Sequence, residues 1–202
     1  MTKIFTTLLV VLGISTTAFS QTKGTTQFGA TIGYNASTVT ASGLTNSDYR
    51  SGFNIGIVAD HYFSESWSIK VKALYDQKGW NSGYLETGNG SYTTNYQLDY
   101  LTIPVMANWH FGRTKNWYLN FGPYLSFLLN AKETANSMDV KSIFSSTDAG
   151  LDVGIGIKFP VSNSTKFFIE LNGLAGVSDL VKDNQGSTLR SSVSAINIGL
   201  NF

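Results

Sequence analysis

Residues 67–78 read WSIKVKALYDQK, and apolar and polar side chains alternate along almost the whole stretch. A repeat of two residues is typical of a β-strand with one apolar and one polar face. The lysines all fall on the polar face, and the opposite face carries no charge. The alternation recurs in seven other stretches, and the eight predicted strands are 28–35, 53–60, 67–78, 100–110, 118–127, 148–159, 167–176 and 196–202.

The strand lengths and the connections favour a membrane barrel. Most of these strands approach the ~9–11 residues that a tilted strand needs to cross a bilayer, whereas soluble strands average about 5–6. No helical pattern separates the strands, so we expect an all-β fold whose sheet is antiparallel, with consecutive strands side by side. Short and long connections alternate, so all long loops fall at one end, as in an up-and-down outer-membrane barrel. A soluble lipocalin-like barrel is the alternative. The short connections are 63–66, 112–116 and 160–165, and the long ones are 37–50, 81–95, 131–147 and 178–191.

The polar faces carry charges that would point into such a barrel. An eight-stranded barrel is just wide enough for side chains to fill it, and buried charges must be paired. The first short turn places Asp60 beside Lys70, and Lys70 or Lys72 can reach Glu170 across the interior. We therefore predict an ion-pair plug, with a gated or proton-conducting pore as the alternative. Its members are Asp60, Lys70, Lys72, Asp76, Asp148, Asp152, Lys158 and Glu170.

Aromatic side chains gather near the ends of the predicted strands. Rings at two levels match the girdles that mark the two lipid–water interfaces of a membrane barrel. The predicted girdle comprises Trp67, Trp109, Trp117, Phe159, Phe167 and Phe202 at the short-turn end, with Tyr75 and Trp80 toward the other end.

The first twenty residues have the features of a secretory signal peptide. Lys3 precedes an apolar stretch over 4–14, and Ala18 and Ser20 form a small-x-small cleavage site before Gln21. The apolar stretch is shorter than the ~20 residues of a transmembrane helix. The predicted organisation is a signal peptide over 1–20 and one barrel domain over 21–202.

Composition excludes several classes of function. The 202-residue chain has a formal net charge of +1, which does not fit a nucleic-acid-binding surface. It has no cysteine, and its two histidines, His61 and His110, both lie near the short-turn end. Asp148 and Asp152 share a strand face about 13 Å apart, too far for an acid–base pair. We therefore predict no catalytic residues, no cofactor and no metal site.

Several short motifs carry a family resemblance. The signal ending Ala18-Phe19-Ser20, the stretch LDYLTIPV over 98–105, the stretch FGPY over 121–124 and the terminal Asn201-Phe202 resemble the small porin-like, PorT-type outer-membrane β-barrel family. The resemblance implies an eight-stranded barrel like those of OmpA and OmpX, with no established catalytic residues. It also implies insertion by the barrel assembly machinery, with Phe202 as the assembly signal. Thr102 departs from the family pattern, in which an acidic residue is expected.

These observations predict a monomeric, non-enzymatic barrel in the cell outer membrane, with structural, adhesive or accessory roles carried by its long loops. The segment from Trp80 to Tyr96 is the candidate for an outside contact, because binding usually lies on loops held by a rigid scaffold. The expected partners are outer-membrane lipids and lipopolysaccharide, the assembly machinery, and an extracellular or periplasmic protein. The alternatives are a secretion-system accessory, a lipid A-modifying enzyme, and a small-solute or ion pore. Pro104 and Pro123, inside predicted strands, are expected at bulges or kinks.

Overall fold

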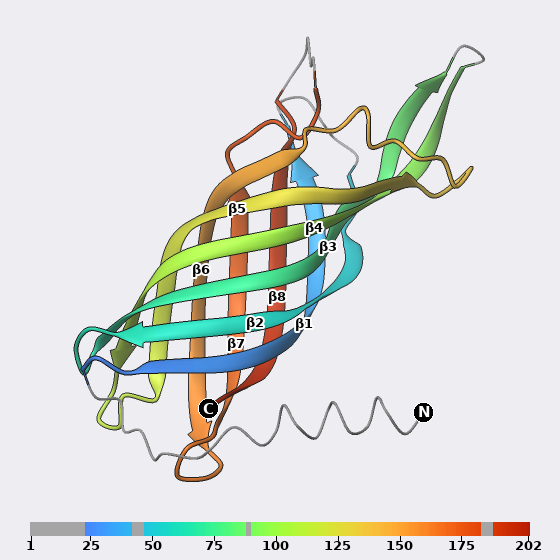
Figure 1. Ribbon diagram of the computed structural model, residues 1–202. Coiled ribbons are helices and arrows are strands. Elements are labelled where there is room, and N and C mark those ends of the chain that lie inside the picture. The colour runs from blue at the N-terminus through green and yellow to red at the C-terminus, as the bar shows by residue number, and fades with distance from the viewer. Residues whose placement is uncertain (1–22, 42–46, 88–89, 183–187) are drawn as a thin grey trace, which may run out of the picture.

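The computed structural model describes residues 23–41, 47–87, 90–182 and 188–202, and these form one closed eight-stranded barrel (Figure 1). Each strand pairs antiparallel with its neighbours, and the first strand closes the ring against the last. This confirms the predicted fold class. The predicted signal peptide, 1–20, lies outside the described residues. The strands are β1 (Thr26–Thr40), β2 (Arg50–Tyr62), β3 (Trp67–Thr87), β4 (Gly90–Phe111), β5 (Trp117–Glu133), β6 (Thr147–Pro160), β7 (Lys166–Gly176) and β8 (Arg190–Asn201).

The apolar faces of the strands lie on the outside of the barrel. Ile69 is 47% exposed and Ile155 is 42% exposed, whereas Lys70 and Glu170 are 2% and 1% exposed. A soluble barrel would bury its apolar faces and expose its charges. The observed arrangement is the reverse, so the lipocalin-like alternative is wrong. In the described residues, no helix has the length and apolar character required to cross a membrane.

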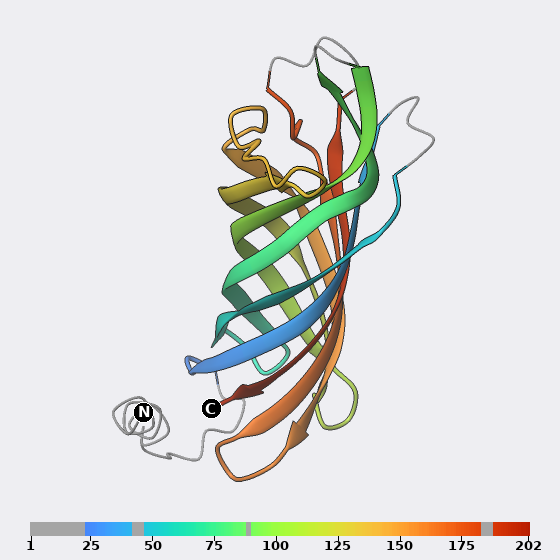
Figure 2. The same cartoon turned by 90° about the vertical axis from the view of Figure 1, so that its right-hand side faces the viewer.

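β3 and β4 are much longer than the other strands and leave the barrel together. They have 21 and 22 residues and pair with each other as far as Thr87 and Gly90. The β4–β5 pairing ends at Tyr96 and Glu133. Residues 81–87 and 90–95 therefore project from the rim as a two-stranded ribbon (Figures 1 and 2). The sequence pattern predicted a loop here, but most of this segment is strand.

The two strand prolines interrupt pairing without shifting it. In the β4–β5 ladder, Pro104 pairs with Tyr124, and the next pair is Ala107 with Phe121 in the same register. Proline has no N–H to donate, so a gap in the ladder is the expected local cost. Neither proline lies at a bulge, because the register shifts lie elsewhere, between Asp99 and Tyr100 and between Trp80 and Gly83. The alternative expectation, a local kink at each proline, stays a prediction.

The wall formed by β8, β1 and β2 is thin. Most of its inward positions are small, and glycine occurs at Gly29, Gly33, Gly56 and Gly199. On the outside of this wall lies an apolar hollow of about 680 Å³. The hollow therefore lies where the inner face of the wall carries glycine in place of larger side chains. The hollow is lined by Ala30, Thr31, Ile32, Ile55, Gly56, Ile57, Phe167, Ile198, Gly199 and Leu200.

Candidate functional site

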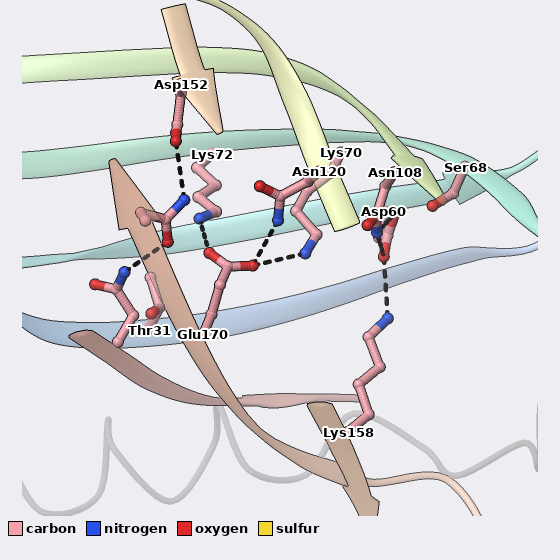
Figure 3. A network of polar contacts seen from close by, with 12 residues as sticks. Thr31, Asp60, Ser68, Lys70, Lys72, Asn108, Asn120, Asp152, Lys158 and Glu170 are labelled. Atoms are coloured by element: carbon pink, nitrogen blue, oxygen red, sulfur yellow. Dashed lines mark hydrogen bonds and ion pairs between the residues drawn. The ribbon is translucent and has the colours of Figure 1, made fainter. Parts of the chain in front are cut away.

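Glu170 lies at the centre of the lumen and binds two lysines. Lys70 Nζ lies 3.0 Å from Glu170 Oε2, and Lys72 Nζ contacts Glu170 Oε1 (Figure 3). Asn120 of β5 donates to the same carboxylate at 2.8 Å. The ammonium of Lys70 also lies 3.8 Å from the centre of the Tyr118 ring. Three strands, β3, β5 and β7, are thereby joined across the interior.

A second ion pair lies toward the short-turn end. Lys158 Nζ is 3.1 Å from Asp60 Oδ2 and donates to the Tyr62 hydroxyl at 2.7 Å. Asn108 Nδ2 also donates to Asp60, at 3.1 Å. Asp60 is the register partner of Lys70, but the predicted pair between them is replaced by Asp60–Lys158. Register fixes neighbouring Cα atoms, whereas a long lysine side chain can reach a carboxylate on another strand.

The third group of charges lies toward the long-loop end. Lys78 Nζ is 3.2 Å from Asp148 Oδ2 and 3.7 Å from Asp76 Oδ2. The Tyr124 hydroxyl donates to Asp148 at 3.1 Å. Asp152 lies apart from this group and accepts a hydrogen bond from Asn172 at 2.9 Å. Each of the eight predicted plug residues is therefore inside the lumen.

A continuous chain of side-chain hydrogen bonds runs around the inner wall. We refer to it as the polar belt. It links one residue from every strand through seven bonds of 2.6 to 3.0 Å. The members, in bonded order, are Asp152 (β6), Asn172 (β7), Asn197 (β8), Asn54 (β2), Asn35 (β1), Asp76 (β3), Thr102 (β4) and Ser126 (β5).

Gly33 allows the belt to cross the thin wall. Asn54 Nδ2 on β2 donates to Asn197 Oδ1 on β8, at 2.8 Å, although β1 lies between these strands. A Cβ added at Gly33 would lie 2.7 Å from Asn54 Nδ2 and closer still to Asn197 Oδ1. A side chain at this position would therefore occupy the space where the two asparagines meet. Beside the belt lies a cavity of about 20 Å³, room for about one water molecule.

The long-loop end of the lumen is filled by apolar and aromatic side chains. Trp80 is 6% exposed and packs on Tyr96, with ring centres 4.6 Å apart, and on Phe144 at 5.9 Å. The predicted place of Trp80 in the girdle is therefore wrong. Trp80 is an even number of residues from Lys72 and Lys78, so the alternation that predicts these lysines inside also predicts Trp80 inside. This mouth cluster comprises Val39, Trp80, Tyr96, Leu98, Tyr100, Leu128, Ala131, Val140, Phe144 and Leu180.

The other predicted girdle residues lie on the outer wall. At the short-turn end, Trp67 stacks beside Trp109 with ring centres 6.2 Å apart. Tyr75 lies on the outer face toward the long-loop end, 5.8 Å from Phe53. Phe202 is 50% exposed, and its backbone pairs with Phe28 at the seam. Trp117 and Phe159 are also exposed, and Phe167 is half-buried.

The comparisons with known proteins match this geometry. The family model of the outer membrane protein beta-barrel domain matches residues 19–182. The chain belongs to this family. OprG from Pseudomonas aeruginosa has a TM-score of 0.53 and 12% identity, with 91% of this chain and 98% of that chain covered. Neisserial surface protein A has a TM-score of 0.51 and 18% identity, with 87% and 97% covered. No curated protein sequence matches the chain.

Membership of the outer membrane protein beta-barrel family confirms the predicted location. The barrel lies in the outer membrane, with its apolar wall against lipid and its charges in the lumen. The likeness to OprG and to the Neisserial protein, at these identities, concerns the fold alone. The PorT-type resemblance within the family stays a prediction.

One buried group contains the residue types of a catalytic triad without its geometry. Ser68 Oγ lies 3.0 Å from His110 Nε2, and Asp60 lies 4.0 Å from that same nitrogen. In a working triad the acid orients the other ring nitrogen. His110 Nδ1 has no hydrogen-bond partner among the described residues, and all three side chains are fully buried. The second histidine, His61, is exposed on the outer wall and contacts Thr26 at 2.9 Å.

The sequence pattern identified the charges but missed the amides that join them. Asn35, Asn54, Asn172 and Asn197 all fall on the inward parity of their strands. Their common position on the inward faces was the sequence signal from which a hydrogen-bonded network could have been predicted. On the part of the chain that the structure describes, no cluster of three or more His, Cys, Asp or Glu residues is placed to hold a metal ion.

Proposed function

We propose that this chain is a closed, non-enzymatic outer-membrane barrel that anchors and displays its outer end. The polar belt and the ion pairs carry this proposal, because they tie all eight strands together across the lumen. The proposed role is structural, adhesive or accessory, and the β3–β4 ribbon is the working surface.

The energetics of the lumen support a plug over a pore. Opening a water path would require separating the lysines from Glu170 and from Asp60, all of which are at most 4% exposed. Breaking one buried ion pair by removing a partner costs roughly 3–5 kcal/mol. The mouth cluster around Trp80 adds an apolar seal at the outer end.

The ribbon supports the display role. Over residues 83–87 and 90–94, β3 and β4 pair only with each other in the described sheet. Residues 134–136 contact β4 at Tyr92, Thr94 and Asn95. The edge of β3 over 83–87 is therefore the one that an extended segment of another protein can join by strand addition. The closed barrel beneath holds this ribbon at a fixed distance above the membrane.

Planar bilayer recording tests the closed lumen. We expect the purified barrel to show no stepwise conductance, and the Glu170→Gln variant to show none either, because the belt remains intact. Reproducible unitary steps from the folded wild-type barrel would contradict the plug and favour the pore.

Removing the ribbon tests the display role. A variant in which Asn81 is joined to Asn95 through Asn-Gly keeps every strand pair within the barrel wall. Heat-modifiable gel mobility will show that it folds. We expect it to lose crosslinks that the wild type makes to surface or secretion proteins in whole cells. Unchanged crosslinks would contradict the display role, and a protein-export defect would assign the accessory role.

A further inference from the structure

Two tyrosine hydroxyls mark the outer lipid–water interface on the barrel wall. Tyr34 and Tyr75 point outward from β1 and β3, and each hydroxyl meets a polar residue one step farther out: Ser51 at 2.6 Å and Gln77 at 3.5 Å. From Trp67 to Gln77, β3 is about 33 Å long, at about 3.3 Å per residue. With a strand tilt of about 40°, this length spans about 25 Å along the membrane normal. That is the height of the apolar band of a membrane barrel.

A connected polar cluster lies on the outer wall just beyond this level. Gln97 of β4 faces outward between the buried Tyr96 and Leu98. Its amide oxygen accepts a bond from Arg50 Nη2 at 2.9 Å, and its amide nitrogen donates to Asp99 at 3.3 Å. Asn130 of β5 donates to the other oxygen of Asp99 at 3.2 Å. Both groups of Gln97 are used, so its orientation is fixed.

The cluster holds one cation in place and has a second one beside it. Lys132 is the register partner of Gln97 and is exposed on the outer face of β5. Residues directly opposite each other in an antiparallel pair have Cβ atoms about 5 Å apart. Arg50 reaches Gln97 from β2, across the intervening strand β3, and Lys132 lies beside Gln97 on the neighbouring strand β5. Arg50 Nε is buried and has no hydrogen-bond partner within the described ranges.

Two carboxylates near this pair are already engaged in hydrogen bonds. Asp99 is only 6% exposed, and both of its oxygens accept amide hydrogens from Gln97 and Asn130. Asp139 lies beside Lys132 in an isolated bridge, but its carboxylate accepts the backbone N–H of Lys141 at 2.8 Å. Lys132 is exposed and Arg50 is half-buried, and among the described residues Lys132 Nζ and Arg50 Nη1 have no bonded partner.

We propose that Arg50 and Lys132 form a binding site for the phosphorylated headgroup of an outer-leaflet glycolipid, with its acyl chains on the apolar wall below. A guanidinium binds phosphate through paired N–H groups, and an ammonium adds a point charge. Gln97 is a positioning residue that holds the guanidinium. The outward column under Lys132, which includes Leu125, Phe127 and Leu129, supplies the surface for the acyl chains. The site does not depend on whether the lumen conducts.

Lipid binding by the folded barrel tests this site. Diphosphoryl lipid A and its dephosphorylated form serve as probes, added to the full-length mature protein in a neutral detergent, and bound lipid is counted by native mass spectrometry. We expect the wild type to prefer the phosphorylated form by at least about tenfold, and the preference to weaken with salt. The double variant Arg50→Gln, Lys132→Gln should lose that preference.

A matched control removes the same charge from the same end of the barrel. Lys182 and Arg190 are exposed cations on the β7–β8 side, away from the cluster. The variant Lys182→Gln, Arg190→Gln should keep the wild-type preference. Equal loss in both double variants would overturn the site in favour of general charge attraction. Equal binding of both lipid forms by the wild type would also overturn it. Heat-modifiable mobility of each variant verifies the fold, and Gln97→Ala should give an intermediate loss if the double variant does not fold.

Discussion

The two halves of the barrel fill the same lumen by different means. The β8–β1–β2 wall uses mainly glycine, small side chains and neutral asparagines, with Asp60 and Tyr62 near the short-turn end of β2 as exceptions. The half formed by β3 to β7 uses long lysines, tyrosines and carboxylates that reach across. The comparison shows that a narrow barrel needs both, because long side chains from every strand would not fit and small ones from every strand would leave a channel.

The largest expected effect lies in the charged half. Glu170→Ala leaves Lys70 and Lys72 buried without their shared carboxylate, which costs roughly 3–5 kcal/mol of unfolding free energy. Urea unfolding in detergent micelles measures this loss. The triple variant Glu170→Leu, Lys70→Met, Lys72→Met removes all three charges and should recover most of the stability. A triple variant as unstable as the single one would show that volume, rather than charge, dominates this half.

The next effect concerns the thin wall. Gly33→Ala places a methyl group where Asn54 meets Asn197, and overpacking of this kind costs roughly 1–3 kcal/mol. Gly173→Ala is the control, because a Cβ there has no atom within 4 Å. We expect the first variant to unfold at lower urea and the second to behave like the wild type. Equal stability of the two would mean that the wall is not tightly packed.

A smaller effect is expected within the polar belt. Asn54→Ala removes the donor that serves Asn35 and Asn197 and leaves both acceptors short of a partner. Each lost buried hydrogen bond costs about 0.5–1.5 kcal/mol. The sum should stay below the cost of Glu170→Ala under the same unfolding conditions. A loss equal to that of Glu170→Ala would erase the distinction between the neutral and charged halves.

The smallest expected effect is on lipid A modification, for which we expect no change. His110→Gln and His61→Gln should leave the lipid A profile of intact cells unchanged, because the geometry around His110 does not fit a triad. Mass spectrometry of extracted lipid A measures this. A profile altered by either substitution would revive the lipid-modifying enzyme as the function.

The sequence was enough to predict the architecture. Alternation placed Lys70 and Glu170 inside and Ile69 and Ile155 outside, because a period of two leaves only one face for charge once lipid surrounds the barrel. The alternation along the strand also predicted an inward Trp80, because its position is an even number of residues from Lys72 and Lys78. The girdle prediction relied instead on its place near the end of a strand.

The bonding partners required the three-dimensional structure. Asp60 faces Lys70 in register but binds Lys158, which comes from a strand that is distant in sequence. The bond between Asn54 and Asn197 depends on Gly33, which lies between them on β1 and has no side chain to separate them. The Gly- and Asn-rich segment over 81–95 lacks a clean alternation, so its pairing as a ribbon was not predictable from pattern alone.

The seam between β1 and β8 has a consequence for biogenesis. Thr31 bonds to the backbone of Ile198 across 167 positions of sequence, so β1 keeps one unsatisfied edge until β8 has been synthesised and delivered. A partly exported chain would therefore offer an open sheet edge that invites aggregation. Covering this edge until β8 arrives would prevent such aggregation, and closure of the ring between β1 and β8 is expected to be the last event of insertion.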